Sequence, residues 1–103
     1  MANWSNRYSY TETNVKKYAP LTAGVYRLIY KKGEDYFVFY VGQSNNIERR
    51  LLEHLSPSEA DSCIKRHLRD YDCFFRFIEI SSLDERNQVE REQIEKYDPP
   101  CNS

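Results

Sequence analysis

The sequence predicts an α/β domain of the α+β type, with a small, largely antiparallel three-stranded sheet flanked by helices. Two β-rich runs flank the charged, glycine-containing segment Lys31–Asp35, a pattern typical of a hairpin. Apolar residues at helical spacing follow this hairpin. A later run, Phe74–Ile80, is aromatic and β-branched and predicts the remaining strand. The predicted order of elements is β-β-α-α-β-α.

Composition limits both the size of the core and the class of partner. The 103 residues suffice for one domain with one hydrophobic core. Nine tyrosines and five phenylalanines favour a β-containing core with aromatic pairs over a leucine-rich bundle. Strong non-specific binding to nucleic acid usually requires a basic protein, and the net charge here is −1. We therefore expect any phosphate binding to be weak or local.

The chain has no apolar leader and no apolar run of membrane-spanning length, which predicts a cytoplasmic protein that does not bind a membrane. Its cysteines, Cys63, Cys73 and Cys101, are odd in number and lack paired CxxC spacing. We accordingly expect neither a disulfide framework nor a zinc site.

Residues 1–22 are polar and contain scattered aromatic residues, and they predict an arm packed on a domain formed by residues 23–103. Pro20 marks the point where this arm ends and the sheet begins. The aromatic side chains of the arm either pack on the domain or stack on exposed bases.

A hairpin that is symmetric about Gly33 places three pairs on one face of the sheet: Tyr26 with Tyr40, Leu28 with Val38 and Tyr30 with Tyr36. A slip of one residue in the register would move one strand's set to the other face. The predicted pairing therefore depends on the turn.

Ile47, Leu51 and Leu55 form an apolar stripe after the hairpin, with Asn45 or Asn46 as the N-cap of a helix. Arg50 and His54 are four residues apart and lie on one flank of that stripe. This arrangement predicts that the arginine and the histidine converge with the two tyrosines of the hairpin.

A second helix is expected from Ser56-Pro57-Ser58-Glu59, with Ser56 as its cap, Pro57 at its first position and the Glu59 side chain reaching back to Ser56 to complete a capping box. Its apolar positions are Ala60, Ile64, Leu68 and Tyr71. Three basic residues are left facing solvent or a phosphate ligand: Lys65, Arg66 and Arg69.

Phe74–Ile80 is apolar on both faces and is the expected central strand. Ser82–Glu85 then predicts a capping box that opens a last helix, which Pro99 and Pro100 terminate.

Glu90 is the anomaly of this last helix, because it shares the inward-facing stripe of Leu83, Asn87, Ile94 and Tyr97. A partly buried carboxylate needs a partner. Two hypotheses meet that need: an ion pair with Arg50 or Arg76, or a bound metal ion.

Six elements in this order resemble the catalytic core of the GIY-YIG nuclease family, and the resemblance spans roughly residues 22 to 102. They are Gly24-Val25-Tyr26, Tyr40-Val41-Gly42, Arg50, His54, Glu90 and Asn102. The resemblance implies a divalent-metal-dependent endonuclease that hydrolyses phosphodiester bonds in DNA.

The resemblance also implies a role for each catalytic residue. Arg50 would bind the phosphate, because its guanidinium is planar and always charged. Glu90 would hold one Mg²⁺ or Mn²⁺ ion. Tyr26 or Tyr40 would orient or deprotonate the attacking water, and His54 would relay the proton. Asn102 completes the expected catalytic set.

The residues expected to contact nucleic acid are Gln43, Ser44, Asn46, Arg49, Lys65, Arg66 and Arg69. Gln43 departs from the lysine that often follows the second family motif. A lone catalytic core lacks appended targeting domains, so we expect a partner protein or homo-oligomerisation to direct it to DNA. The alternative is a degenerate module that keeps the fold and binds nucleic acid or protein without cleavage.

Overall fold

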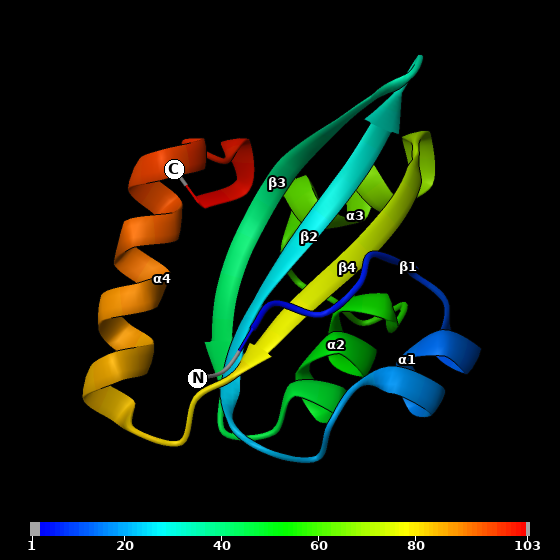
Figure 1. The fold of residues 1–103 in the computed structure, drawn as a ribbon. Helices are drawn as coiled ribbons and strands as arrows, with labels where there is room; N and C mark the ends of the chain where they lie inside the picture. The colour runs from blue at the N-terminus through cyan, green and yellow to red at the C-terminus, as the bar shows by residue number, and fades with distance from the viewer. Residues whose placement is uncertain (1–2, 103) are drawn as a thin grey trace.

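The computed structural model describes residues 3–102 and has a four-stranded antiparallel sheet in the order β1-β4-β2-β3 (Figure 1). The strands are β1 Tyr8–Ser9, β2 Gly24–Lys32, β3 Asp35–Ser44 and β4 Asp72–Glu79. The helices are α1 Glu12–Tyr18, α2 Ile47–Leu55, α3 Ser62–Asp70, α4 Leu83–Tyr97 and the 3₁₀ turn η1 Pro100–Asn102. The predicted fold class is confirmed. Among the three predicted strands the central one is β2 rather than β4, and β4 has a second neighbour only because the two-residue β1 pairs with it.

The prediction of three strands was wrong, because residues 3–22 contribute a strand and a helix of their own. Tyr8 pairs with Phe75 and Ser9 with Phe74, which adds β1 to the edge of β4. A two-residue strand carries no periodic pattern, so only its pairing with β4 defines it. Helix α1 follows and packs against α2.

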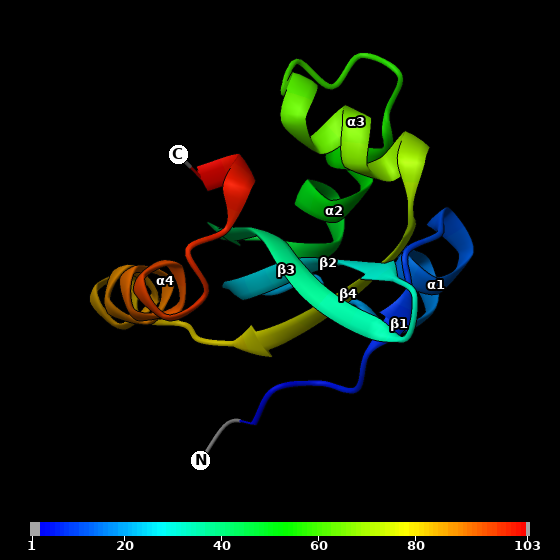
Figure 2. The same ribbon diagram turned by 90° about the horizontal axis from the view of Figure 1, so that it is seen from above.

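Two apolar clusters lie on the two faces of the sheet. Helices α2 and α3 cover one face, while α4 runs along the β3 side and the N-terminal segment crosses the opposite face (Figure 2). The larger cluster, under α2 and α3, contains Tyr26, Leu28 and Phe75. The smaller one joins Val25 and Val41 to partly buried residues of α4 and the N-terminal segment. The tyrosine motifs therefore face the helix-covered side.

The hairpin register differs from the symmetric one that the sequence predicted. Lys32 pairs with Asp35 around a turn in which Gly33 has a φ of 64°, a value that favours glycine. A bulge then shifts the register between Leu28 and Ile29, so that Tyr26 lies opposite Gly42 rather than Tyr40.

The bulge changes which residues share a face. Phe39 and Tyr40 are consecutive, yet both pack with the larger cluster. Val38 joins Val25 and Val41 in the smaller cluster, which corrects its predicted place beside Leu28. A bulge cannot be read from alternation, because it interrupts the alternation itself.

The second helix begins at Ser62 rather than at Pro57. Asp61 is its N-cap, and its side chain accepts a hydrogen bond from the Ile64 N–H. The expected capping box does not form because Glu59 accepts from the Asp61 N–H and contacts His54 instead. The other helix starts agree with prediction: Asn46 caps α2 and Ser82 caps α4.

Cys63 and Cys101 form a disulfide, so the prediction of unpaired cysteines was wrong. The bond joins α3 to η1 across 38 residues of sequence, a relationship that short cysteine spacings do not reveal. Cys73 is free. Within residues 3–102, no helix is both long and apolar enough to cross a membrane.

Candidate active site

Two glycines explain how the tyrosine motifs pack. A Cβ at Gly42 would overlap the hydroxyl of Tyr26, which lies opposite it in the sheet. A Cβ at Gly24 would overlap the backbone oxygen of Ile78 on β4. The ring centroids of Tyr26 and Tyr40 are 6.2 Å apart as a result of this close packing. Both glycines are therefore required by contact rather than by backbone angle.

Helix α2 brings His54 onto the tyrosines. Ile47 and Leu51 are fully buried on the sheet, and His54 follows them on the same side with 1% of its surface exposed. The hydroxyl of Tyr26, itself 0% exposed, lies 2.8 Å from His54 Nε2. The ring of Tyr40 contacts the same imidazole edge-on, with 5.4 Å between the two ring centroids. Tyr26 and His54 thus form a buried hydrogen-bonded pair.

Glu59 extends this pair to three residues. It was not predicted from the sequence as a site residue. Its Oε2 lies 2.7 Å from His54 Nδ1, and its Oε1 accepts from the Asp61 N–H at 2.9 Å. The sequence signal was present, since Glu59 lies five residues after His54. The sequence also predicts a capping box for Glu59, and only the turn after α2 in the structure shows its contact with His54.

Burial strongly raises the pKa of Tyr26, and the neighbouring Tyr40 raises it further, while the charge of Arg50 lowers it. Burial also raises the pKa of Tyr40. The pKa of His54 is lowered, first by burial and then by Arg50, although Glu59 opposes the shift. At neutral pH the site therefore holds protonated phenols beside a neutral imidazole.

Arg50 lies at the mouth of this buried group. Its side chain is 37% exposed, and its Nη1 is 3.2 Å from Glu53 Oε1. It borders an open depression that also includes Ser56, Ser58 and Glu59. Burial raises the pKa of Tyr26, and the charge of Arg50 acts in the opposite direction by favouring the phenolate form. The outer surface of Arg50 remains open to an anion.

Glu90 approaches the site from α4 and is half-buried. Its Oε1 accepts a hydrogen bond from Gln43 Nε2 at 3.2 Å. The predicted arginine partners are bound elsewhere: Arg50 to Glu53, and Arg76 to the backbone oxygen of Ser5. Burial is the main cause of the raised tyrosine pKa values, and the negative charge of Glu90 adds to it for both phenols.

The inward face of α4 is rotated from the predicted one. Leu83 and Asn87 are exposed, whereas Arg86 is buried and donates hydrogen bonds to the backbone oxygens of Ile80 and Ser81. Because the buried residue Arg86 is charged rather than apolar, the apolar pattern of the sequence does not mark the face of α4 that is buried.

Gln43 is held by α4. Its Nε2 donates to Asn87 Oδ1 and to Glu90, and its Oε1 accepts from Arg86 Nε at 3.3 Å. Its amide thus links the end of β3 to α4 beside the Glu90 carboxylate.

Asn102 also acts on β3, since its Oδ1 accepts from the Val41 N–H and its Nδ2 donates to the Val41 oxygen. It therefore holds the strand next to Tyr40.

The model of the GIY-YIG catalytic domain matches residues 22–102 of this chain. The chain belongs to the GIY-YIG family. Solved structures with the same fold include the GIY-YIG N-terminal endonuclease domain of UvrC from Thermotoga maritima bound to magnesium as its catalytic divalent cation. That structure has 26% sequence identity and a TM-score of 0.66, and the match covers 87% of this chain and 97% of that one.

A second structure of the same UvrC domain carries an asparagine-to-alanine substitution and is also bound to its catalytic divalent cation. It has 25% identity and a TM-score of 0.64, with 85% of this chain and 93% of that chain covered. A tyrosine-to-phenylalanine variant gives 26% identity and a TM-score of 0.66, with coverage of 87% and 96%. No curated protein sequence matches the chain.

The remaining predicted nucleic-acid contacts of this GIY-YIG domain are divided between the end of β3, the start of α2 and helix α3. Ser44 and Asn46 hydrogen bond to each other at the start of α2. Arg49 binds Asn45 and Lys65 binds the Pro57 oxygen. Arg66 and Arg69 are exposed on α3, and Arg69 pairs with Asp70.

Glu90 fits a metal ligand in this GIY-YIG domain. A carboxylate oxygen is the ligand type that Mg²⁺ and Mn²⁺ prefer, and one protein carboxylate is enough where waters and substrate oxygens fill the other positions. Glu90 lines a hollow of about 530 Å³ together with Asn87, Arg91, Ile94 and Glu95. That hollow leaves room for water beside the carboxylate.

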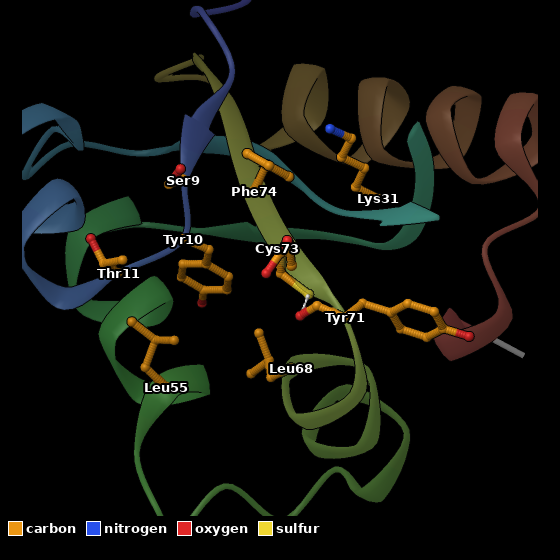
Figure 3. A pocket seen from close by; sticks show the side chains of 10 residues that line it. Ser9, Tyr10, Thr11, Lys31, Leu55, Leu68, Tyr71, Cys73 and Phe74 are labelled. Carbon is orange, nitrogen blue, oxygen red and sulfur yellow. Dashed lines mark hydrogen bonds between the residues drawn. The ribbon is translucent and has the colours of Figure 1, made fainter. Parts of the chain in front are cut away.

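A separate pocket of about 420 Å³ lies between the starts of α1 and β4 and the ends of α2 and α3 (Figure 3). Leu55, Leu68 and Phe74 line it, and Cys73 is its only thiol. Burial raises the pKa of Cys73 to about 12, so this thiol is not a nucleophile at neutral pH. No predicted catalytic residue lines this pocket.

Proposed function

We propose that this GIY-YIG domain is a divalent-metal-dependent endonuclease that hydrolyses phosphodiester bonds in DNA. The supporting observation is the buried hydrogen bond from Tyr26 to His54, with Arg50 and Glu90 within electrostatic range of the same phenol. A phenol in contact with a neutral imidazole has a proton acceptor, which a tyrosine needs in order to act at neutral pH. The magnesium-bound UvrC domain supports the reaction class.

Phosphodiester hydrolysis builds negative charge on the phosphate oxygens during in-line attack by water. Arg50 binds these oxygens through its exposed guanidinium. Tyr40 is half-buried and faces the same side as Tyr26, so it orients the attacking water.

The proton of the attacking water passes to the buried pair behind Tyr40. One O–H bond of water and the P–O bond to the leaving oxygen break as the new P–O bond forms. The Tyr26 oxygen takes up this proton while its own proton moves to His54 Nε2. This concerted transfer avoids a free Tyr26 phenolate, which burial makes costly. The leaving oxygen is protonated from solvent.

Glu90 would hold the divalent ion, with Gln43 fixing the orientation of its carboxylate. A bound ion would neutralise charge that develops on the phosphate and the leaving oxygen. Asn102 acts on the site through the backbone of Val41 rather than through the substrate.

The test is to incubate the purified protein with supercoiled plasmid and with branched DNA, in Mg²⁺, in Mn²⁺ and in EDTA. Cleavage should need the metal. Glu90→Gln should abolish cleavage while leaving the melting temperature nearly unchanged, and Arg50→Ala should abolish cleavage while metal binding persists. Glu92→Gln, an exposed substitution on the same helix, is the matched control. Full metal-dependent cleavage by Glu90→Gln would remove the central residue of the proposal.

The second candidate function is binding without cleavage. Gln43 favours it, because its amide is committed to α4 where family members often carry a phosphate-binding lysine. DNA binding with no metal-dependent product on either substrate would support this alternative.

A further inference from the structure

Glu59 is held in one position by two hydrogen bonds. Its side chain is 8% exposed, its Oε2 faces His54 Nδ1 at 2.7 Å, and its Oε1 accepts from the Asp61 N–H at 2.9 Å. Neither His54 nor Glu59 can rotate without breaking a buried contact. The carboxylate therefore has a defined partner on each oxygen.

The proton positions follow from these contacts. Burial works against the charge of Glu59, but its hydrogen bonds with the Asp61 backbone and with His54 prevail and lower its pKa. An ionised carboxylate only accepts, so His54 Nδ1 must carry a proton. Burial, together with Arg50, lowers the pKa of His54, so the ring is neutral and Nε2 bears a lone pair.

We propose that Glu59 is a positioning residue that fixes the Nδ1–H tautomer of His54 and so makes Nε2 the acceptor of the Tyr26 proton. A carboxylate that orients an imidazole in this way needs no contact with the substrate. The tautomer assignment is independent of cleavage, while its effect on rate rests on the proposed nuclease function.

Glu59→Gln tests the assignment because an amide has one accepting oxygen and one donating NH₂ group. The Asp61 N–H cannot reverse its polarity, so the amide oxygen stays with it. The NH₂ group then faces His54 Nδ1, which must give up its proton and move it to Nε2. A protonated Nε2 cannot accept from Tyr26.

The first measurement is the ¹⁵N and long-range ¹H–¹⁵N NMR spectrum of the histidine rings at pH 7.5. The wild type should show a protonated Nδ1 and an unprotonated Nε2 for His54, and Glu59→Gln should show the reverse. Tyr26→Phe should leave the wild-type tautomer in place, because Glu59 rather than Tyr26 sets it. His67, the second histidine, is the internal reference.

The second measurement is steady-state cleavage over a series of DNA concentrations. Glu59→Gln should lower kcat about 100-fold with KM for DNA within twofold, since only proton transfer is impaired. Glu34→Gln, in the exposed hairpin turn, should keep the wild-type rate.

A wild-type spectrum with Nε2 protonated would overturn the inference, even if Glu59→Gln failed to fold. An unchanged tautomer in a folded Glu59→Gln protein would also overturn it. If neither protein cleaves DNA, the nuclease proposal fails, and the NMR comparison still decides the role of Glu59.

Discussion

Asn102 pairs with the peptide of Val41 on both sides: its Oδ1 accepts from the Val41 N–H at 2.8 Å, and its Nδ2 donates to the Val41 oxygen at 2.9 Å. Since β3 is the edge strand of the sheet, Asn102 takes the place of a further strand at this position. Val41 lies between Tyr40 and Gly42. The 3₁₀ turn at the C-terminal end thereby holds the second tyrosine motif in place.

Asn102→Ala should destabilise the protein by about 1–3 kcal/mol, because it leaves a strand N–H and a carbonyl without their partner. Cleavage should fall with stability as Tyr40 becomes less constrained. Urea unfolding measures the loss, and Asn45→Ala, at an exposed position, is the control. Equal stability of the two variants would show that the pairing contributes nothing.

Gly42→Ala should displace the Tyr26 hydroxyl from His54, since the added methyl group would overlap it. We expect a stability loss of about 1–3 kcal/mol together with loss of cleavage. Gly33→Ala is the matched comparison: its φ of 64° makes alanine cost about 1–2 kcal/mol, but it lies at the hairpin turn. We expect the two variants to have similar stability and only Gly33→Ala to cleave DNA. A fully active Gly42→Ala protein would contradict it.

Stability should decrease as pH falls below about 6.5, and cleavage should decrease at lower pH, as the pH approaches the lowered pKa of His54 in the folded protein. Burial, followed by Arg50, lowers the pKa of His54 from its usual value of 6.5, against the opposing charges of Glu59 and Asp61. Between the folded pKa and 6.5 the unfolded chain binds more protons, so acidification favours unfolding. Protonated Nε2 also cannot accept the Tyr26 proton.

Urea unfolding at a series of pH values from 5 to 8 checks this dependence. His54→Gln should flatten the stability profile in that window. An unchanged profile in His54→Gln would assign the pH dependence to other groups.

Reduction of the Cys63–Cys101 disulfide should lower the free energy of unfolding by about 2–4 kcal/mol, because the bond closes a long loop in the unfolded chain. Alkylation of denatured protein should give one adduct before reduction, at Cys73, and three after it. Three adducts without reductant would show that the bond does not form. Cys73→Ala is the control that should keep the sensitivity to reductant.

Binding to duplex DNA should be weak and nearly independent of sequence, because the net charge is −1. The basic residues available for phosphate contact are Arg49, Arg50, Lys65, Arg66 and Arg69. Fluorescence anisotropy across a salt series should give a shallow slope that reflects few phosphate contacts. Tight, sequence-selective binding at physiological salt would contradict this expectation.

Local patterns in the sequence were enough to predict several helix starts and the family. Asn46, Ile47 and Leu51 specify a capped helix within one short stretch, and Ser82 does so for the last helix. The order of the tyrosine motifs, Arg50, His54 and Glu90 indicated the family without any knowledge of distances. Such signals are legible because capping and helical periodicity depend on neighbours in the chain.

Only the tertiary structure decided the hairpin register, the partner of Glu90, the role of Glu59 and the cysteine pairing. The bulge before Tyr40 allows Phe39 and Tyr40 to pack with the same cluster under α2 and α3, and the disulfide forms where α3 meets η1. Glu59 fits a local capping rule in the sequence, but in the structure its carboxylate contacts the buried imidazole of His54. Contacts between residues distant in sequence depend on how whole elements dock, and no local pattern encodes that docking.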